Sequence, residues 1–166
     1  MEKNPANEFV ISRTLNAPRD KVWRAWTERE ELMKWFGPKG VTIPVANMDL
    51  RPGGVFHYCM RMPDGQDWWG KWTFREIVAP LKLVLISTFS DAQGGITRHP
   101  MAADWPLQTL STTTFEAQGD NTVLTISWSP WQASEAEMKK FAESHAGMQQ
   151  GWGGTFEQLT AYLAAN

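Results

Sequence analysis

The chain has 166 residues, a formal net charge of −2, one cysteine and ten tryptophans. This length predicts a single domain over residues 1–166, with a core from about residue 8 to residue 164. The near-neutral charge argues against nucleic acid as a partner, because phosphate backbones are bound by basic surfaces. One cysteine excludes an internal disulfide, and no run of 18 apolar residues predicts membrane insertion. The polar first residues lack the apolar core of a signal peptide, so we expect a cytoplasmic protein.

The first part of the chain predicts a strand followed by two short helices. Residues 8–16 alternate apolar and polar side chains, which is typical of a strand. Residues 17–27 place apolar side chains at helical spacing. Thr27 and Glu30 then form a capping-box pattern, which predicts the start of a second helix that ends before Gly37.

Six strands are expected next, and most of the links between them are short. Their approximate ranges are 41–50, 54–62, 67–78, 81–90, 108–117 and 121–129. Turn-forming runs such as "RPGG" and "QGDN" separate them, and short links imply antiparallel neighbours. The link 91–107 is the exception, since its length is typical of a functional lid or of a disordered segment.

The tryptophan-rich strand at 67–78 assigns its apolar side chains to one face. The face expected to point inward carries Trp68, Gly70, Trp72, Phe74 and Val78. Trp69 would then point outward, which indicates an apolar surface patch compatible with a homodimer.

The chain ends in a long predicted helix. Ser134 and Glu137 form another capping box, and apolar residues at helical spacing make one stripe over about thirty residues. Four glycines between positions 147 and 154 weaken this helix, each by up to about 1 kcal/mol relative to alanine. We expect the helix to kink there, or another backbone or a ligand to come close.

These elements predict an α+β domain in which a curved antiparallel sheet wraps around the long C-terminal helix. Such a sheet meets the helix closely only at the ends of its groove, so we expect a hollow between them. Ligand pockets usually have apolar walls and a few polar groups. The first ligand-binding candidates are therefore inward-facing apolar residues and ring-bearing residues with a polar atom. They are Phe56, Tyr58, Met60, Trp72, Phe74, Phe89, Trp128, His145 and Trp152.

A solid aromatic core is the alternative explanation for the tryptophans. Burying one tryptophan contributes roughly 6 kcal/mol as an upper limit. Stability alone therefore accounts for several of the ten rings.

Five stretches resemble a known family. They are "APRDKVWRAWTEREELMKWFGP", "DLRPGG" with "MPDG", Gly70 before "FREIVAPLKLVL", "HPMAADWPLQTLSTTTF" and "GMQQGWGGTFEQLTAYL". From about Phe9 to Leu163 the chain resembles the START-like (SRPBCC) superfamily. Within it, the chain is similar to the single-domain homologues of the activator of the 90-kDa heat-shock protein ATPase. The resemblance implies a helix-grip fold with an internal cavity, whose border would include Trp26, Trp35 and Met148.

The resemblance and the aromatic residues together favour a protein that binds a hydrophobic or aromatic small molecule, as a carrier or a sensor without a cofactor. The alternative is an enzyme of cyclase or hydrolase type that acts on a lipid-like or aromatic substrate, with His145 as acid or base. A third interpretation, a chaperone partner, is not expected, because the family name comes from a larger two-domain protein.

Motifs for other chemistry are missing from the sequence. No P-loop, dinucleotide fingerprint or nucleophile motif occurs in it. Three histidines and Cys59 are too scattered to predict a metal site. The sequence therefore favours a binding protein over an enzyme.

Overall fold

The computed structural model describes residues 8–166, and the strands within this range form one antiparallel sheet. The elements are β1 (Phe9–Leu15), α1 (Arg19–Thr27), α2 (Arg29–Trp35), β2 (Thr42–Met48), β3 (Val55–Arg61), β4 (Asp67–Val78), β5 (Lys82–Ser90), β6 (Ile96–Thr97), β7 (Thr109–Gln118), β8 (Asn121–Pro130), α3 (Glu135–Glu143) and α4 (His145–Ala165). The strand order is β1-β8-β7-β5-β4-β3-β2, and β6 pairs with β5.

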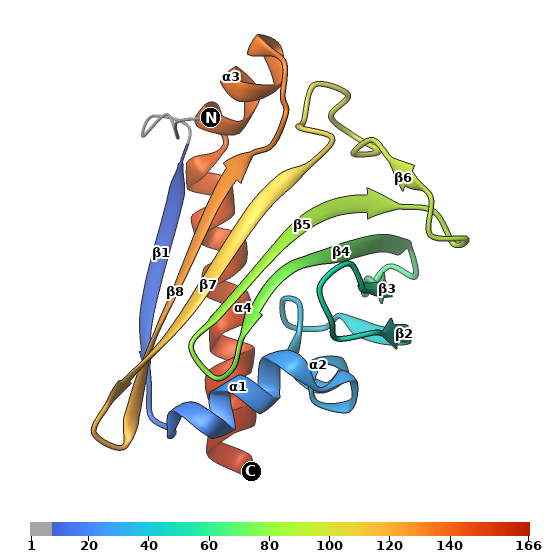
Figure 1. Ribbon diagram of the computed structural model, residues 1–166. Helices are drawn as coiled ribbons and strands as arrows, with labels where there is room; N and C mark the ends of the chain where they lie inside the picture. The colour runs from blue at the N-terminus through green and yellow to red at the C-terminus, as the bar shows by residue number, and fades with distance from the viewer. Residues whose placement is uncertain (1–7) are drawn as a thin grey trace.

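The sheet curves around α4, while α1 and α2 cross the end of the groove where α4 finishes (Figure 1). Helix α3 and the link from β5 to β7 lie at the opposite end. The predicted α+β fold, with a curved antiparallel sheet and a long C-terminal helix, is therefore confirmed. The link predicted at 91–107 adds one short strand, β6, which pairs with Phe89 and Ser90.

None of the helices within residues 8–166 combines the length and the apolar character that crossing a bilayer requires. The expectation that the chain has no signal peptide concerns its first residues, and most of these lie outside the described residues.

The C-terminal helical region breaks at Ser144 and not at the glycines. Ser144 has φ −101° and ψ 5°, and its hydroxyl donates to the carbonyl of Lys140 at 2.7 Å. A serine bonded in this way competes with the helical backbone and bends it. Of the two alternatives for the glycines, the helix does not break there, because α4 runs unbroken through all four. The other alternative, that another backbone or a ligand comes close, stays a prediction. The capping box of Ser134 and Glu137 at the start of α3 is confirmed.

The predicted capping box of Thr27 and Glu30 was wrong. Thr27 is the last residue of α1, and its hydroxyl donates to the carbonyl of Trp23 at 2.7 Å. The residue that caps α2 is Glu28, without a side-chain hydrogen bond. The hydroxyl of this buried threonine is therefore bonded back within the first helix and does not begin the second.

The inward face of β4 holds as predicted from Trp68 to Phe74 and then changes sides. The register between β4 and β5 shifts between Phe74 and Glu76, so Ile77 packs against the core and Val78 is 38% exposed. The prediction that Val78 points inward was wrong, because a shift of one residue reverses the faces of a strand.

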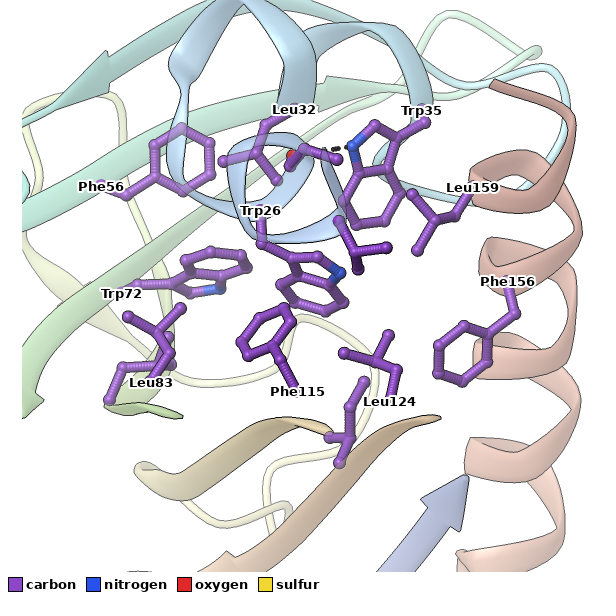
Figure 2. Packing of buried hydrophobic residues seen from close by; sticks show 14 of the residues in the cluster. Trp26, Leu32, Trp35, Phe56, Trp72, Leu83, Phe115, Leu124, Phe156 and Leu159 are labelled. Atoms are coloured by element: carbon purple, nitrogen blue, oxygen red, sulfur yellow. Dashed lines mark hydrogen bonds between the residues drawn. The ribbon is translucent and has the colours of Figure 1, made fainter. Parts of the chain in front are cut away.

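The core is solid at the end of the groove covered by α1 and α2. Figure 2 shows its rings and aliphatic side chains converging from both helices, from the sheet and from α4. The indole of Trp35 is buried there, and its Nε1 donates to the carbonyl of Ala25 at 2.9 Å. The alternative explanation of the tryptophans is thus correct for this part of the molecule.

Gly70 is required by the side chain of Tyr58 on the neighbouring strand. The two residues are paired across β3 and β4, and the tyrosine ring lies over the glycine. A Cβ atom at position 70 would stand 2.4 Å from Cζ and from the hydroxyl oxygen of Tyr58. Only glycine leaves room for this ring.

We predict that Gly70→Ala lowers the free energy of unfolding by about 1–3 kcal/mol, because the added methyl group displaces the Tyr58 ring. Urea denaturation measures this loss. In a Tyr58→Ala background the same change should have a much smaller effect. An equal loss in both backgrounds would show that the contact with Tyr58 is not the reason for the glycine.

Candidate functional site

A cavity of about 470 Å³ lies between the inner face of the sheet and α4, beyond the solid core. Strands β3, β4, β5, β7 and β8 contribute one wall, and α4 contributes the other. Eight of the twelve predicted site residues line it: Trp26, Tyr58, Met60, Trp72, Phe89, Trp128, Met148 and Trp152. Their role in ligand binding stays a prediction.

The other four predicted residues lie outside the cavity wall. Trp35, Phe56 and Phe74 are at most 3% exposed and belong to the solid core. His145, the first residue of α4, lies between the rings of Phe9 and Phe141, at centroid distances of 5.6 and 5.5 Å. Its Nε2 is buried and has no hydrogen-bond partner within residues 8–166. The break at Ser144 places this histidine beyond the stretch of α4 that faces the cavity.

Three parallel or tilted indole rings join the sheet to α4 at the inner end of the cavity. The ring of Trp26, from α1, stacks with Trp72 of β4 at 6.2 Å and with Trp152 of α4 at 6.1 Å. Trp128 of β8 meets Trp152 edge to face at 5.5 Å. Aromatic pairs in these geometries are favourable beyond the area that they bury. The rings therefore fix the separation of the sheet and the helix at this level.

The link between β5 and β7 covers the other end of the cavity. We call residues 91–107 the lid segment. Its residues His99, Trp105 and Pro106 line the cavity, although the sequence analysis named none of them as a site residue. A long connection has no hydrophobic period, so no local pattern indicates which of its side chains turn inward.

His99 is enclosed by aromatic rings from the sheet and the lid segment. Its ring lies 4.8 Å from that of Phe89, 5.6 Å from Trp68 and 6.1 Å from Trp105. Burial lowers the pKa of His99, and the charge of Lys140 lowers it further. The backbone N–H of Met101 donates to Nδ1 at 3.0 Å, so the neutral imidazole carries its proton on Nε2.

The cavity wall carries no aspartate, glutamate, lysine or arginine within the described residues. Burial also raises the pKa of Tyr58, so its hydroxyl stays protonated at physiological pH. No group of three metal-ligating side chains comes together within residues 8–166. The chemistry of this cavity is therefore that of an uncharged, largely aromatic enclosure with a few hydrogen-bonding groups.

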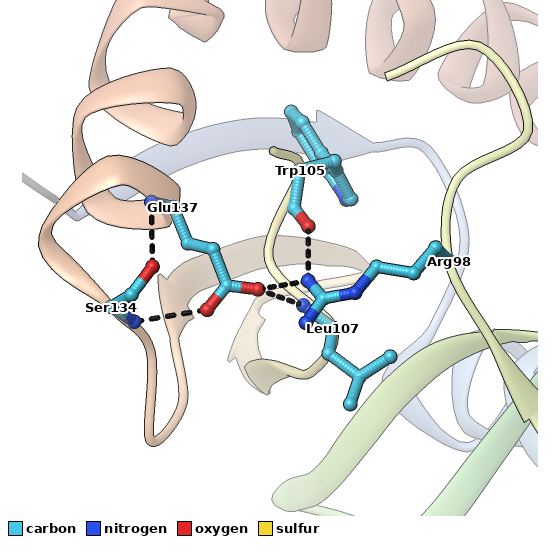
Figure 3. A network of polar contacts seen from close by, with 5 residues as sticks. All are labelled: Arg98, Trp105, Leu107, Ser134 and Glu137. Atoms are coloured by element: carbon cyan, nitrogen blue, oxygen red, sulfur yellow. Dashed lines mark hydrogen bonds and ion pairs between the residues drawn. The ribbon is translucent and has the colours of Figure 1, made fainter. Parts of the chain in front are cut away.

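Glu137 fastens the lid segment to α3. One carboxylate oxygen accepts from the backbone N–H of Ser134 at 2.9 Å, which completes the capping box. The other accepts from the N–H of Leu107 at 3.1 Å and from Arg98. Arg98 also donates to the carbonyl of Trp105 at 3.4 Å. The stretch from Arg98 to Leu107 is therefore tied at both ends to the buried side chain of Glu137 (Figure 3).

The hydrogen bonds to Glu137 decide its protonation. Burial alone would raise the pKa of this carboxyl group. The N–H groups of Ser134 and Leu107 and the guanidinium of Arg98 outweigh burial, and they hold the pKa below its ordinary value near 4.5. A group with a lowered pKa in the folded state stabilises the fold above its unfolded pKa, and this contribution is lost as the pH falls through the folded pKa.

We predict that Glu137→Ala lowers the free energy of unfolding by about 1–3 kcal/mol at pH 7, because it leaves three partly buried hydrogen bonds without their acceptor. The difference from the natural chain should shrink as the pH falls below about 4.5. Urea denaturation at a series of pH values measures both effects. Glu135→Ala, at an exposed position of the same helical turn, is the control and should have little effect. A loss that is the same at every pH would contradict the role of the carboxylate charge.

Comparison with known proteins agrees with this geometry. The curved sheet, the helix and the cavity between them define a protein of the START-like, helix-grip class. The family model described as "Activator of Hsp90 ATPase homolog 1-like protein" matches residues 16–164, so the chain belongs to that family. No curated protein matches the chain.

Solved bacterial structures share the fold over nearly the whole chain. A protein from Arthrobacter aurescens is 29% identical with a TM-score of 0.79, and the match covers 99% of this chain and 91% of that one. A protein from Nitrosomonas europaea is 26% identical with a TM-score of 0.77, covering 98% and 97% of the two chains. A protein from Mycobacterium smegmatis is 25% identical with a TM-score of 0.77, covering 97% and 93%.

Proposed function

We propose that this protein binds a hydrophobic or aromatic small molecule in the cavity between the sheet and α4, as a carrier or a sensor. The observation that carries this proposal is a cavity of about 470 Å³ whose wall, as far as residues 8–166 form it, is aromatic and free of charged side chains. Ligand sites in proteins are typically clefts of about 300–1,000 Å³ with apolar walls and a few polar groups. Membership in a START-like family supports the same function.

The size of the cavity gives an expected affinity. A ligand of about 17–20 non-hydrogen atoms that gains about 0.3 kcal/mol per atom binds with about −5 to −6 kcal/mol. This corresponds to a dissociation constant of about 40–200 µM. A search for ligands should therefore begin at high ligand concentration.

The enzymatic alternative loses the residue on which it was based. His145 lies outside the cavity wall, between Phe9 and Phe141. His99 does lie on the wall, but the described residues that line the cavity include no aspartate or glutamate to act with it in acid–base catalysis. A binding function needs no such pair, and it is the function that the geometry supports best.

We predict that N-phenyl-1-naphthylamine, a neutral probe whose fluorescence rises in apolar surroundings, binds with a dissociation constant of about 40–200 µM. Trp152→Ala should weaken this binding, because it removes part of the cavity wall. Trp131→Phe is the control, since Trp131 lies outside the wall and packs against Arg75. Titrations that show no saturable rise with the natural chain would contradict the proposed function.

Gly151 offers a second test, because it lines the cavity on the same face of α4 as Met148 and Thr155. Gly153 lies on the same helix but outside the cavity wall, and a Cβ atom at either glycine would meet nothing within 4 Å. Both changes to leucine should therefore be tolerated by the fold, with a gain in helix propensity of up to about 1 kcal/mol.

We predict that Gly151→Leu weakens binding of the same probe by about tenfold or more, which corresponds to about 1.4 kcal/mol. The leucine side chain would occupy part of the space that the probe needs. Gly153→Leu should bind the probe like the natural chain, and thermal unfolding confirms that both variants are folded. Equal affinities for the two variants would count against a ligand in this cavity.

A further inference from the structure

We propose that the cavity selects neutral ligands that carry a hydrogen-bonding oxygen, and that His99 and a strip of hydroxyl groups on the sheet bind this oxygen. The hydroxyl strip consists of Ser87, Thr109 and Ser111. This inference rests on the proposed function and names the class of ligand. Its basis is a set of polar groups on the cavity wall that have no partners of their own.

Strand register brings the hydroxyl strip together on the inner face of the sheet. Ser87 of β5 pairs with Thr109 of β7, and Ser111 follows two residues later on the same face, paired with Leu85. All three residues line the cavity. Thr109 and Ser111 are only 4% and 6% exposed, yet no hydroxyl of the strip has a hydrogen-bond partner within residues 8–166.

Unpartnered hydroxyls in such buried positions call for an explanation. Most buried polar side-chain atoms in proteins are hydrogen-bonded to protein or to water. Two other buried threonines follow that rule: Thr122 donates to the carbonyl of Ala17 at 2.8 Å, and Thr155 donates to that of Gly151 at 3.1 Å. The hydroxyl strip differs because its groups border open space, where a ligand oxygen can accept or donate.

His99 stands beside the same part of the sheet. Its ring contacts Phe89, which is two residues along β5 from Ser87, a spacing of about 7 Å. The N–H of Met101 occupies Nδ1, so Nε2 carries the proton. This nitrogen has no partner within the described residues and can donate to a ligand oxygen.

The absence of charge on the described wall restricts the ligand further. Burying a carboxylate is expensive unless a cation or several hydrogen bonds compensate for it. The described residues of the wall include no lysine or arginine, and burial lowers the pKa of His99, which favours its neutral form. Fatty acids and aromatic acids should therefore bind poorly, whereas neutral ketones, esters, amides and alcohols satisfy the polar groups without bringing a charge.

The test uses three probes with the same naphthalene body: 2-acetylnaphthalene, 2-isopropylnaphthalene and 2-naphthoate. The first has a neutral oxygen, the second replaces this oxygen by a methyl group, and the third is charged at pH 7.5. Each is titrated against the protein loaded with N-phenyl-1-naphthylamine, and its displacement gives a dissociation constant. The natural chain is compared with His99→Phe, Thr109→Val and Ser111→Ala.

Thr113→Val is the matched control. Thr113 lies on β7 two residues beyond Ser111, on the same face and 1% exposed, but it does not line the cavity. The ratio of the ketone and hydrocarbon dissociation constants is the decisive quantity, because it cancels general effects of a substitution on the cavity. Three separate variants keep the test valid if one of them fails to fold.

We expect the ratio to shift against the ketone by about three- to tenfold in the site variants, the size of one lost hydrogen bond. It should stay unchanged in Thr113→Val. The naphthoate should bind the natural chain at least about tenfold more weakly than the ketone. An unchanged ratio in every site variant, or a naphthoate that binds as well as the ketone, would overturn this inference alone. Failure of the hydrocarbon and of the loaded probe to bind at all would overturn the proposed function as well.

Discussion

The indole of Trp26 is the constraint on which the rest of the structure depends. It stacks with Trp72 from the sheet on one side and with Trp152 from α4 on the other. Packed aromatic rings are nearly incompressible, so these three rings set how closely the sheet and the helix can approach. On one side of Trp26, the groove is filled by rings such as Trp35 and Phe115. On the other side the cavity begins, and Trp128 of β8 and Trp152 of α4 line it.

Helix α4 contributes to the cavity by what it lacks. Its glycines leave open space beside the backbone, and a side chain at Gly151 would stand on the cavity face. These glycines cost helix stability, which the packing of Phe156, Leu159 and Leu163 against the rest of the core offsets. The lid segment, which Glu137 holds to α3, lines the other end of the cavity. The cavity thus has a fixed inner end and a tethered segment along its other end.

Sequence alone predicted the architecture well because its signals are local and periodic. The alternation in β4 identified the inward face up to Phe74, and the capping box of Ser134 and Glu137 identified the start of α3. Both features depend on neighbours a few residues away in the chain. The family resemblance added the position of α4 relative to the sheet.

The errors came from features that depend on distant parts of the chain. Whether Thr27 caps one helix or ends another is decided by its burial, and the side taken by Val78 is decided by a register shift with β5. Trp35 and Trp72 resemble each other in the sequence, but only the packing around them places one in the solid core and the other on the cavity wall. His99 carries no periodic signal at all, because its inward position results from the path of the lid segment. Local patterns therefore identify the layers, while the division between core and cavity requires the full structure.

The most direct measurement is a crystal structure of the protein grown with N-phenyl-1-naphthylamine. The account predicts density for the probe between the sheet and α4, in contact with Trp72, Trp128 and Trp152, with the Trp26 ring in its present place. Side chains that close the space between sheet and helix, with the probe absent from it or bound on the outer surface, would contradict it.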